Sequence, residues 1–216
     1  MTASRLHHDG GGKPPSSARK RILEAARRQF AEHGFAGASI RAITGSLGLR
    51  ESAFYAHFTS KQAAYDELFH EAGPAVIAHI AARLDPSNPL EQELAMLARR
   101  ALAAWTNKDA RASTSIVLRE SFERRGEKRQ QLMSGVSTAL DILAAQLTRW
   151  QQRGEVRPSL HPRDLAFAFV APLITARFLF YNNAASAAER RQGAAVVQRH
   201  VATFAALVRP LPGALS

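Results

Sequence analysis

Side chains that could recognise DNA bases stand together at residues 50–52. Arg50 can bond bidentately to guanine, and Glu51 can accept a hydrogen bond from cytosine N4. Ser52 and Tyr55 share the outer face of the same predicted helix, because the apolar residues of this segment fall on its inner face: Leu49, Ala53, Phe54 and Phe58. Glu51 also suits the first turn of a helix, where a carboxylate interacts favourably with the helix dipole. The sequence leaves both roles open for Glu51.

The segment before this helix predicts the element that holds it in place. Ser39 can cap a helix by accepting a hydrogen bond from an otherwise unpaired backbone N–H. Ile40, Ile43 and Leu47 then recur with the spacing of one helical face. Gly48 stands where this helix must end, since glycine adopts the left-handed conformation without steric cost. Two short helices joined by a tight turn, the second with a polar outer face, predict a helix-turn-helix.

The same stretch resembles the DNA-binding domain of the tetracycline-repressor (TetR) family. Several features follow one another in the family's order over about 50 residues. They are Gly34-Phe35, Ser39-Ile40-Arg41-Ala42-Ile43, Gly48-Leu49, Phe54-Tyr55-Ala56-His57-Phe58 and Lys61. Thr44-Gly45 departs from the family pattern, and Gly45 should cost up to about 1 kcal/mol of helix stability relative to alanine.

The resemblance implies further contacts with DNA beside those of residues 50–52. Tyr55 and His57 resemble phosphate contacts. Lys61 resembles the family lysine at the start of the next helix, where the helix N-terminus and the ammonium both favour a phosphate. The complete predicted DNA-contacting set is Ser39, Arg41, Arg50, Glu51, Ser52, Tyr55, His57 and Lys61.

The resemblance also implies an all-α architecture, with an N-terminal three-helix helix-turn-helix domain and a C-terminal helical domain that binds an effector and dimerises. We expect a disordered arm over residues 1–15, the DNA-binding domain over residues 16–72 and the effector-binding and dimerisation domain over residues 73–216. The apolar pattern itself predicts helices without strands. Outside the helix-turn-helix they span residues 16–33, 60–84, 90–107, 110–123, 127–153, 162–183 and 187–208. Gly73-Pro74 should kink the helix over 60–84, either as a plain break or as a functional pivot.

Residues 165–181 are apolar on nearly every side, so this helix must be buried on more than one face. The run contains Pro172 and Arg177 and is too short for a convincing membrane span. In the family, the last two long helices of each subunit form a four-helix dimer interface, and a homodimer suits a palindromic operator. The predicted effector-pocket residues also fit ordinary packing. They are Trp105, Phe122, Trp150, Arg177, Phe178 and Tyr181, with Arg177 as a candidate anchor for an acidic group.

Composition limits the function classes further. The 216 residues carry a formal net charge of +11, which favours an anionic partner, but residues 1–70 hold only 10 Lys and Arg against 6 Asp and Glu. Charge alone therefore does not identify DNA. The chain has no cysteine, and we find no Gly-rich phosphate loop, nucleophile motif or metal-spaced His/Asp set. We expect no enzymatic activity, no cofactor and no metal. The first 15 residues lack the apolar core of a signal peptide, which predicts a cytoplasmic protein without a membrane partner.

The sequence therefore predicts a homodimeric transcriptional regulator that represses by binding a palindromic operator and is released by a small-molecule effector. Two alternatives keep the same fold: an activator, and a DNA-binding protein without an effector. A helical protein that binds anionic membrane surfaces is a further alternative that the positive charge allows.

Overall fold

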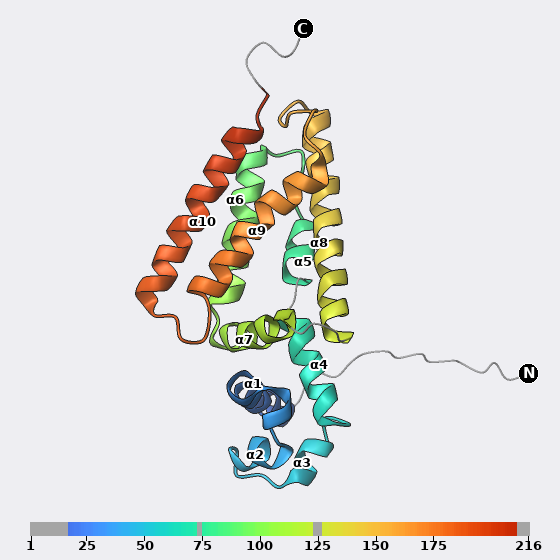
Figure 1. The fold of residues 1–216 in the computed structure, drawn as a ribbon, viewed down its shortest axis with the longest axis vertical. Coiled ribbons are helices and arrows are strands. Elements are labelled where there is room, and N and C mark those ends of the chain that lie inside the picture. Colours follow the sequence, from blue (N-terminus) through green and yellow to red (C-terminus); the bar gives the residue numbers. More distant parts are fainter. Residues whose placement is uncertain (1–16, 73–74, 123–126, 211–216) are drawn as a thin grey trace, which may run out of the picture.

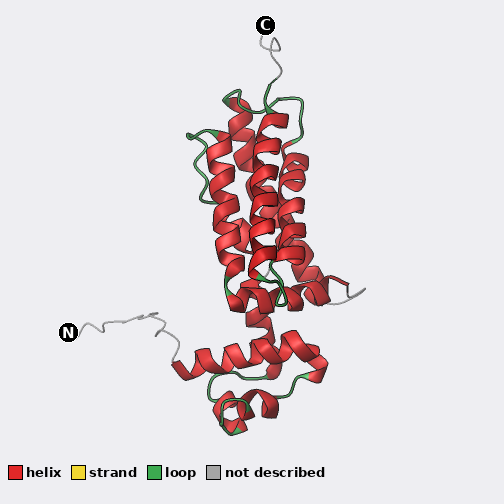
Figure 2. Ribbon diagram, turned by 90° about the vertical axis from the view of Figure 1, so that its left-hand side faces the viewer, coloured by secondary structure: helices red, strands yellow, loops and turns green. Residues whose placement is uncertain are grey.

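A computed structural model describes residues 17–72, 75–122 and 127–210 of the chain. These residues form ten helices and no strand, so the all-α prediction is confirmed for them. Figures 1 and 2 show a small domain at one end and a longer bundle above it. The helices are α1 (Ser17–Gly37), α2 (Ile40–Gly45), α3 (Glu51–Tyr55), α4 (Lys61–Ala72), α5 (Ala75–Ala81), α6 (Leu90–Thr106), α7 (Lys108–Phe122), α8 (Glu127–Gln152), α9 (Pro162–Phe180) and α10 (Ala187–Val208).

The small domain consists of α1 to α4 around an apolar core. Ile22 and Phe30 of α1 are fully buried, as their spacing predicts, and Phe54 of α3 packs beneath the helix-turn-helix. α1 is interrupted at Gly34, whose φ of 71° lies in the left-handed region. The chain turns back there and brings the Phe35 ring to 5.0 Å from the Tyr65 ring of α4.

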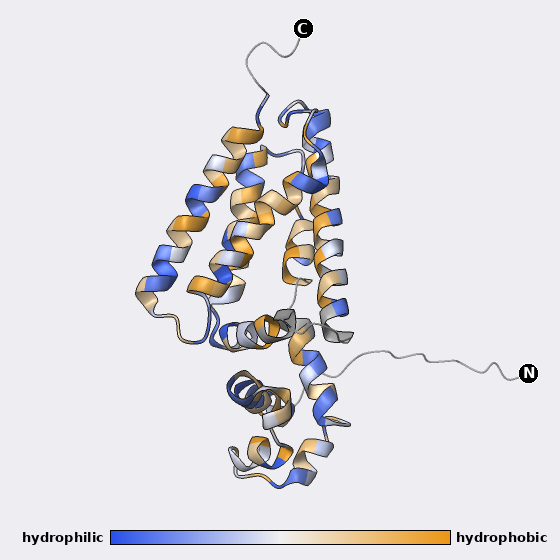
Figure 3. Ribbon diagram, in the orientation of Figure 1, coloured by the Kyte–Doolittle hydropathy of each residue, from blue (hydrophilic) through white to orange (hydrophobic). Residues whose placement is uncertain are grey.

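The bundle consists of α5, α6, α8, α9 and α10, with α8 packed against α5 and α9, and α10 packed against α6 and α9. In Figure 3 apolar and polar residues alternate along α8 and α10, as expected of helices with one buried and one exposed face. Trp150, Phe169 and Leu173 lie in the centre of this core. The apolar helix predicted near residues 165–181 buries one face in this core, but Phe167 and Leu179 on its other face are exposed. It ends at Phe180 rather than at residue 183.

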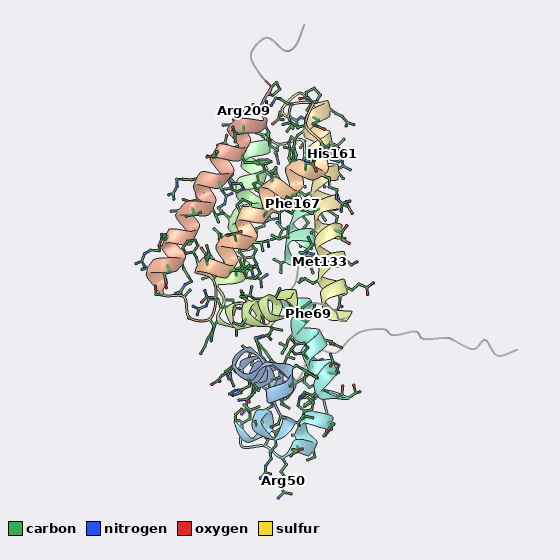
Figure 4. All side chains as sticks on the ribbon, viewed as in Figure 1. Arg50, Phe69, Met133, His161, Phe167 and Arg209 are labelled. Atoms are coloured by element: carbon green, nitrogen blue, oxygen red, sulfur yellow. The ribbon has the colours of Figure 1, made fainter. Side chains whose placement is uncertain are left out.

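α7 lies across the junction of the two parts and packs against both α1 and α4 (Figure 1). Ile116 and Val117 of α7, together with Leu132 of α8, belong to the same core cluster as the residues of the small domain. Phe69 of α4, labelled at this junction in Figure 4, is 2% exposed in that cluster. The small domain therefore shares one apolar core with α7 and the start of α8.

Two sequence predictions fall on undescribed parts of the chain. The arm over residues 1–15 and the Gly73-Pro74 kink lie outside the described residues, and the helix predicted over 60–84 is observed as α4 and α5 on either side of residues 73–74. Among the helices that the structure describes, none is long and apolar enough to span a membrane.

Candidate nucleic-acid interface and ligand cavity

Local hydrogen bonds build the turn between α2 and α3. Ser39 precedes α2 with φ −127° and ψ 150°, and its Oγ accepts the Ala42 N–H at 3.1 Å, so the predicted cap is confirmed. Gly48 adopts φ 69°, and the next residue, Leu49, donates its N–H to Thr44 O at 3.0 Å. The turn therefore closes back on α2 and fixes the direction in which α3 leaves it.

The polar residues predicted to contact DNA lie on the solvent side of this unit. Arg50 extends from the tip of the small domain, away from the rest of the molecule (Figure 4). Tyr55 is 56% exposed although tyrosine is largely apolar, while its neighbour Phe54 is buried beneath it. Six of the eight predicted contact residues are exposed, and the other two are half-buried. The exposed ones are Ser39, Arg41, Arg50, Glu51, Ser52 and Tyr55, and the half-buried ones are His57 and Lys61.

Within the described residues, the side chains of Arg41, Arg50 and Glu51 make no hydrogen bond or ion pair. Arg50 stands at the N-cap of α3 without a side-chain capping bond, and Glu51 occupies the first turn. Their charges are therefore free to meet a ligand. Glu51 also lies where it interacts favourably with the dipole of α3, so the structure is compatible with both of its predicted roles.

Lys61 is engaged inside the protein. Its Nζ donates to Phe35 O at 2.8 Å and to Ala38 O at 2.9 Å, and it lies 4.4 Å from the centroid of the Phe35 ring. This ammonium ties the start of α4 to the end of α1 and the approach to α2. The sequence did not reveal this role, because the acceptors are backbone carbonyls more than 20 residues away. That Lys61 contacts a phosphate stays a prediction. Only the third N–H of its ammonium is available for such a contact.

A second unpredicted contact fastens α1 to α4. Arg19 donates through its two terminal nitrogens to the Glu67 carboxylate at 2.8 and 2.6 Å. Its guanidinium carbon also lies 4.7 Å from the centroid of the Phe58 ring. Planar, bidentate pairing of this kind fixes geometry as well as contributing energy. It holds α4 in register with α1 directly above the α3 segment.

A cavity of about 190 Å³ lies in the bundle, between α5, α6, α7, α8 and α9. Apart from Arg177, its walls are almost entirely apolar. The lining residues are Val76, Ile77, Trp105, Val117, Leu132, Met133, Val136, Ala139, Val170, Ile174, Arg177 and Phe178.

The structure brings three of the predicted pocket residues, Trp105, Arg177 and Phe178, to this cavity. Trp150 and Tyr181 lie outside it. The Trp150 indole donates to Asn88 O at 2.9 Å, and the Tyr181 hydroxyl donates to Arg190 O at 2.9 Å, so both are held by polar contacts elsewhere in the core. The side chain of Phe122 lies outside the described residues.

Arg177 is the charged residue of the cavity wall and is only 4% exposed. Its Nε donates to Thr114 Oγ1 at 3.3 Å, and its guanidinium carbon lies 5.5 Å from the centroid of the Trp105 ring. No ion pair with a described carboxylate accompanies these contacts. Burial lowers the pKa of Arg177 from its ordinary value to about 10, so the side chain stays cationic at neutral pH.

Residues 22–68 match the family described as bacterial regulatory proteins, tetR family. This match coincides with the small domain, from the buried face of α1 to the middle of α4. This part of the chain is a DNA-binding domain of the TetR family.

Relatives of known name are regulators rather than enzymes. The chain is 43% identical over 51 residues to the HTH-type transcriptional repressor AcnR of Corynebacterium glutamicum, which covers 24% of this chain and 27% of the relative. It is 25% identical over 143 residues to the HTH-type transcriptional regulator UidR of Escherichia coli K12, over 66% of this chain and 71% of UidR. The alignments to AcnR proteins thus span about a quarter to a third of those relatives' length.

A solved structure extends the TetR-family likeness beyond the small domain. A bacterial regulatory protein in the tetR family from Rhodococcus RHA1 superposes with a TM-score of 0.67 at 21% identity, over 91% of this chain and all of the other. At that identity the likeness supports the fold over the matched part of the chain and nothing finer.

Proposed function

We propose that this TetR-family chain is a ligand-responsive transcriptional repressor that binds a palindromic operator as a homodimer and is released by a small-molecule effector. One observation carries the proposal. Val117 and Leu132 line the cavity of the bundle and also belong to the core of the DNA-binding domain. A molecule in the cavity would therefore contact side chains that also pack against the DNA-binding domain.

The DNA-binding function is assigned to residues 16–72, with α3 as the recognition helix. Arg50, Glu51 and Ser52 stand at its exposed N-terminal end, the part of a helix-turn-helix that reaches base edges. Tyr55 and His57 are assigned to phosphates. We assign repression rather than activation because the relative AcnR is a transcriptional repressor. We place the protein in the cytoplasm because its proposed partner is DNA.

Effector binding and dimerisation are assigned to residues 73–216. Phe167 and Leu179 of α9 are 60% and 61% exposed, and Leu207 of α10 is 63% exposed. Such large apolar side chains in water on two adjacent helices suit an interface with a second copy. A two-fold dimer would present two recognition helices to operator half-sites about 34–36 Å apart.

The proposed release is a shift between two populations of the dimer. Because α7 contacts α1 and α4, a displacement of α7 changes how the DNA-binding domain sits on the bundle. An effector that prefers the displaced arrangement lowers operator affinity by as much as its affinity differs between the two arrangements.

The test is selection from a random duplex DNA library, followed by fluorescence anisotropy on the enriched sequence at several salt concentrations. We expect a palindrome whose binding is weakened in Arg50→Ala and Tyr55→Phe at unchanged melting temperature. Because Arg50 is assigned to a base edge, Arg50→Ala should also relax specificity at one base position. The Tyr55 hydroxyl is uncharged, so Tyr55→Phe should leave the salt slope nearly unchanged.

Arg99→Ala is the matched control. Arg99 is exposed on α6, and its replacement removes the same charge far from α3. If Arg99→Ala weakens binding as much as Arg50→Ala, or if no palindrome is enriched, binding depends on net charge and the proposed operator recognition is refuted.

A further inference from the structure

We propose that the cavity binds a small monocarboxylate, a single-ring or short branched acid, whose carboxylate is held by Arg177 and the indole N–H of Trp105. This inference names the effector class and rests on the proposed function. It is carried by two buried hydrogen-bond donors at one apolar cavity and by the size of that cavity.

The first donor is the Arg177 guanidinium. A buried charge is costly unless it is paired, and buried arginines are almost always paired with an acid. In the part of the chain that the structure describes, Arg177 donates only through Nε, to Thr114 Oγ1. Its two terminal amino groups remain for another acceptor. A carboxylate can take both, since it matches the planar fork of the guanidinium.

The second donor is the Trp105 indole. Trp105 is 1% exposed and lines the cavity, yet its Nε1 has no hydrogen-bond partner among the residues that the structure describes. Buried tryptophans usually satisfy this N–H, as Trp150 does with Asn88 O at 2.9 Å. The Trp105 ring stands 5.5 Å from the guanidinium carbon of Arg177. The two donor side chains are therefore neighbours in the wall of one cavity.

The other residues of the cavity wall favour a ligand whose remaining part is apolar. Val136 and Ala139 of α8 and Val170 and Ile174 of α9 offer neither charge nor hydrogen bonds. A second polar group on the ligand would lose its water without gaining a partner. The ligand is therefore a monoanion with its acid at one end and a hydrocarbon at the other.

The volume sets the size of the ligand. A cavity of about 150 Å³ with apolar walls accommodates benzene, and this one measures about 190 Å³. The difference leaves room for a carboxylate on a single ring. Met133, labelled on α8 in Figure 4, lines the cavity and is 45% exposed. A long acyl chain exceeds this space.

Isothermal titration of the full-length protein tests the inference. The probes are benzoate, cyclohexanecarboxylate and isovalerate, each paired with its neutral amide of nearly equal shape. We expect each acid to bind wild type about 10- to 100-fold more tightly than its amide, the range for one hydrogen bond to a charged group. Decanoate should bind more weakly than benzoate.

Two variants test which residues cause the preference for acids over amides. Arg177→Met should abolish the acid-over-amide ratio while leaving amide binding nearly unchanged. Trp105→Phe keeps a smaller aromatic side chain but removes the N–H, and should weaken binding of the acids by about 5- to 10-fold. Trp150→Phe is the control, because Trp150 lies outside the cavity and should leave both affinities unchanged.

The inference is overturned if no acid binds, if acids and amides bind equally, or if Arg177→Met retains the ratio. These outcomes are separable from failure of the proposed function. Operator selection on the ligand-free protein is independent of them, so a retained palindrome without acid binding refutes only the effector class. Acid binding without an enriched palindrome refutes only the operator function.

Discussion

Replacing Arg177 with methionine is expected to stabilise the ligand-free protein while removing acid binding. Burial lowers the pKa of the guanidinium from its ordinary value to about 10. At about 1.4 kcal/mol per pKa unit, keeping this group charged inside the fold costs about 3 kcal/mol. The variant loses the Thr114 hydrogen bond and the contact with the Trp105 ring, together roughly 1–2 kcal/mol. The expected net gain in the free energy of unfolding is therefore about 1–2 kcal/mol.

Urea unfolding followed by circular dichroism measures this gain, at one fixed protein concentration because a dimer's stability depends on concentration. The folded pKa of Arg177 lies below the unfolded one. The free-energy cost of burying the charged guanidinium is therefore fully present below pH 10 and falls as the pH rises past that value. The difference between variant and wild type should be flat from about pH 6 to pH 9.

Arg99→Met is the control for this experiment. Arg99 is exposed on α6, so the same substitution there should change the free energy of unfolding by no more than about 0.5 kcal/mol. A loss of stability in Arg177→Met would refute the reasoning, because it would mean that the native fold already compensates the buried charge. Arg177 would then be a structural residue rather than one kept for a ligand.

Five further substitutions test the structure elsewhere. Lys61→Met should lower the free energy of unfolding by about 1–3 kcal/mol, since two backbone carbonyls lose their donor, and a melting curve unchanged from wild type would contradict this. Gly48→Ala should lower the free energy of unfolding by about 1–2 kcal/mol because the φ of Gly48 is 69°. The Cβ of Gly45→Ala meets no atom within 4 Å, so this substitution should raise the free energy of unfolding by up to about 1 kcal/mol. Chemical denaturation that gives both changes the same sign would contradict this assignment. Gly193→Ala places a Cβ 2.5 Å from Phe180 Cβ and should cost about 1–3 kcal/mol by separating α9 from α10, which thermal unfolding measures and a wild-type curve would disprove. Leu179→Glu should dissociate the dimer in sedimentation velocity while the helical circular dichroism signal stays unchanged, and a dimer that persists would exclude this part of α9 from the interface.

The features that could be predicted from the sequence are those fixed by local interactions. Ser39 caps α2 and Gly48 ends the following turn through contacts within a few residues, so residue type and spacing suffice to find them. The boundaries of α6, α8 and α10 agree with the prediction to within a residue because apolar periodicity ends at loop residues. The recognition surface follows from the same local pattern, since Phe54 must point inward and its neighbours outward.

The features that sequence reasoning missed depend on which distant groups meet. Lys61 was predicted to face phosphate, but it donates to Phe35 at the end of α1 and to Ala38 just after that helix. No spacing rule points from residue 61 to these two carbonyls. Trp105 and Trp150 are the same residue type, both fully buried, and both were predicted for the pocket. Only the folded chain distinguishes them, because the Asn88 carbonyl meets the Trp150 indole and nothing meets that of Trp105.

The shared wall at α7 limits how the proposed regulation can operate. Val117 contacts the cavity from one side and the core of the DNA-binding domain from the other, so no separate relay is needed between the two sites. Since packed interiors tolerate little volume change, a ligand that fills the cavity must either fit the present wall or move it. A ligand that fits leaves operator affinity unchanged, however tightly it binds. A ligand that moves the wall weakens operator binding, and by linkage the operator must weaken ligand binding by the same factor. Acids that bind alike but differ in bulk against Val117 should therefore differ in how strongly they release DNA.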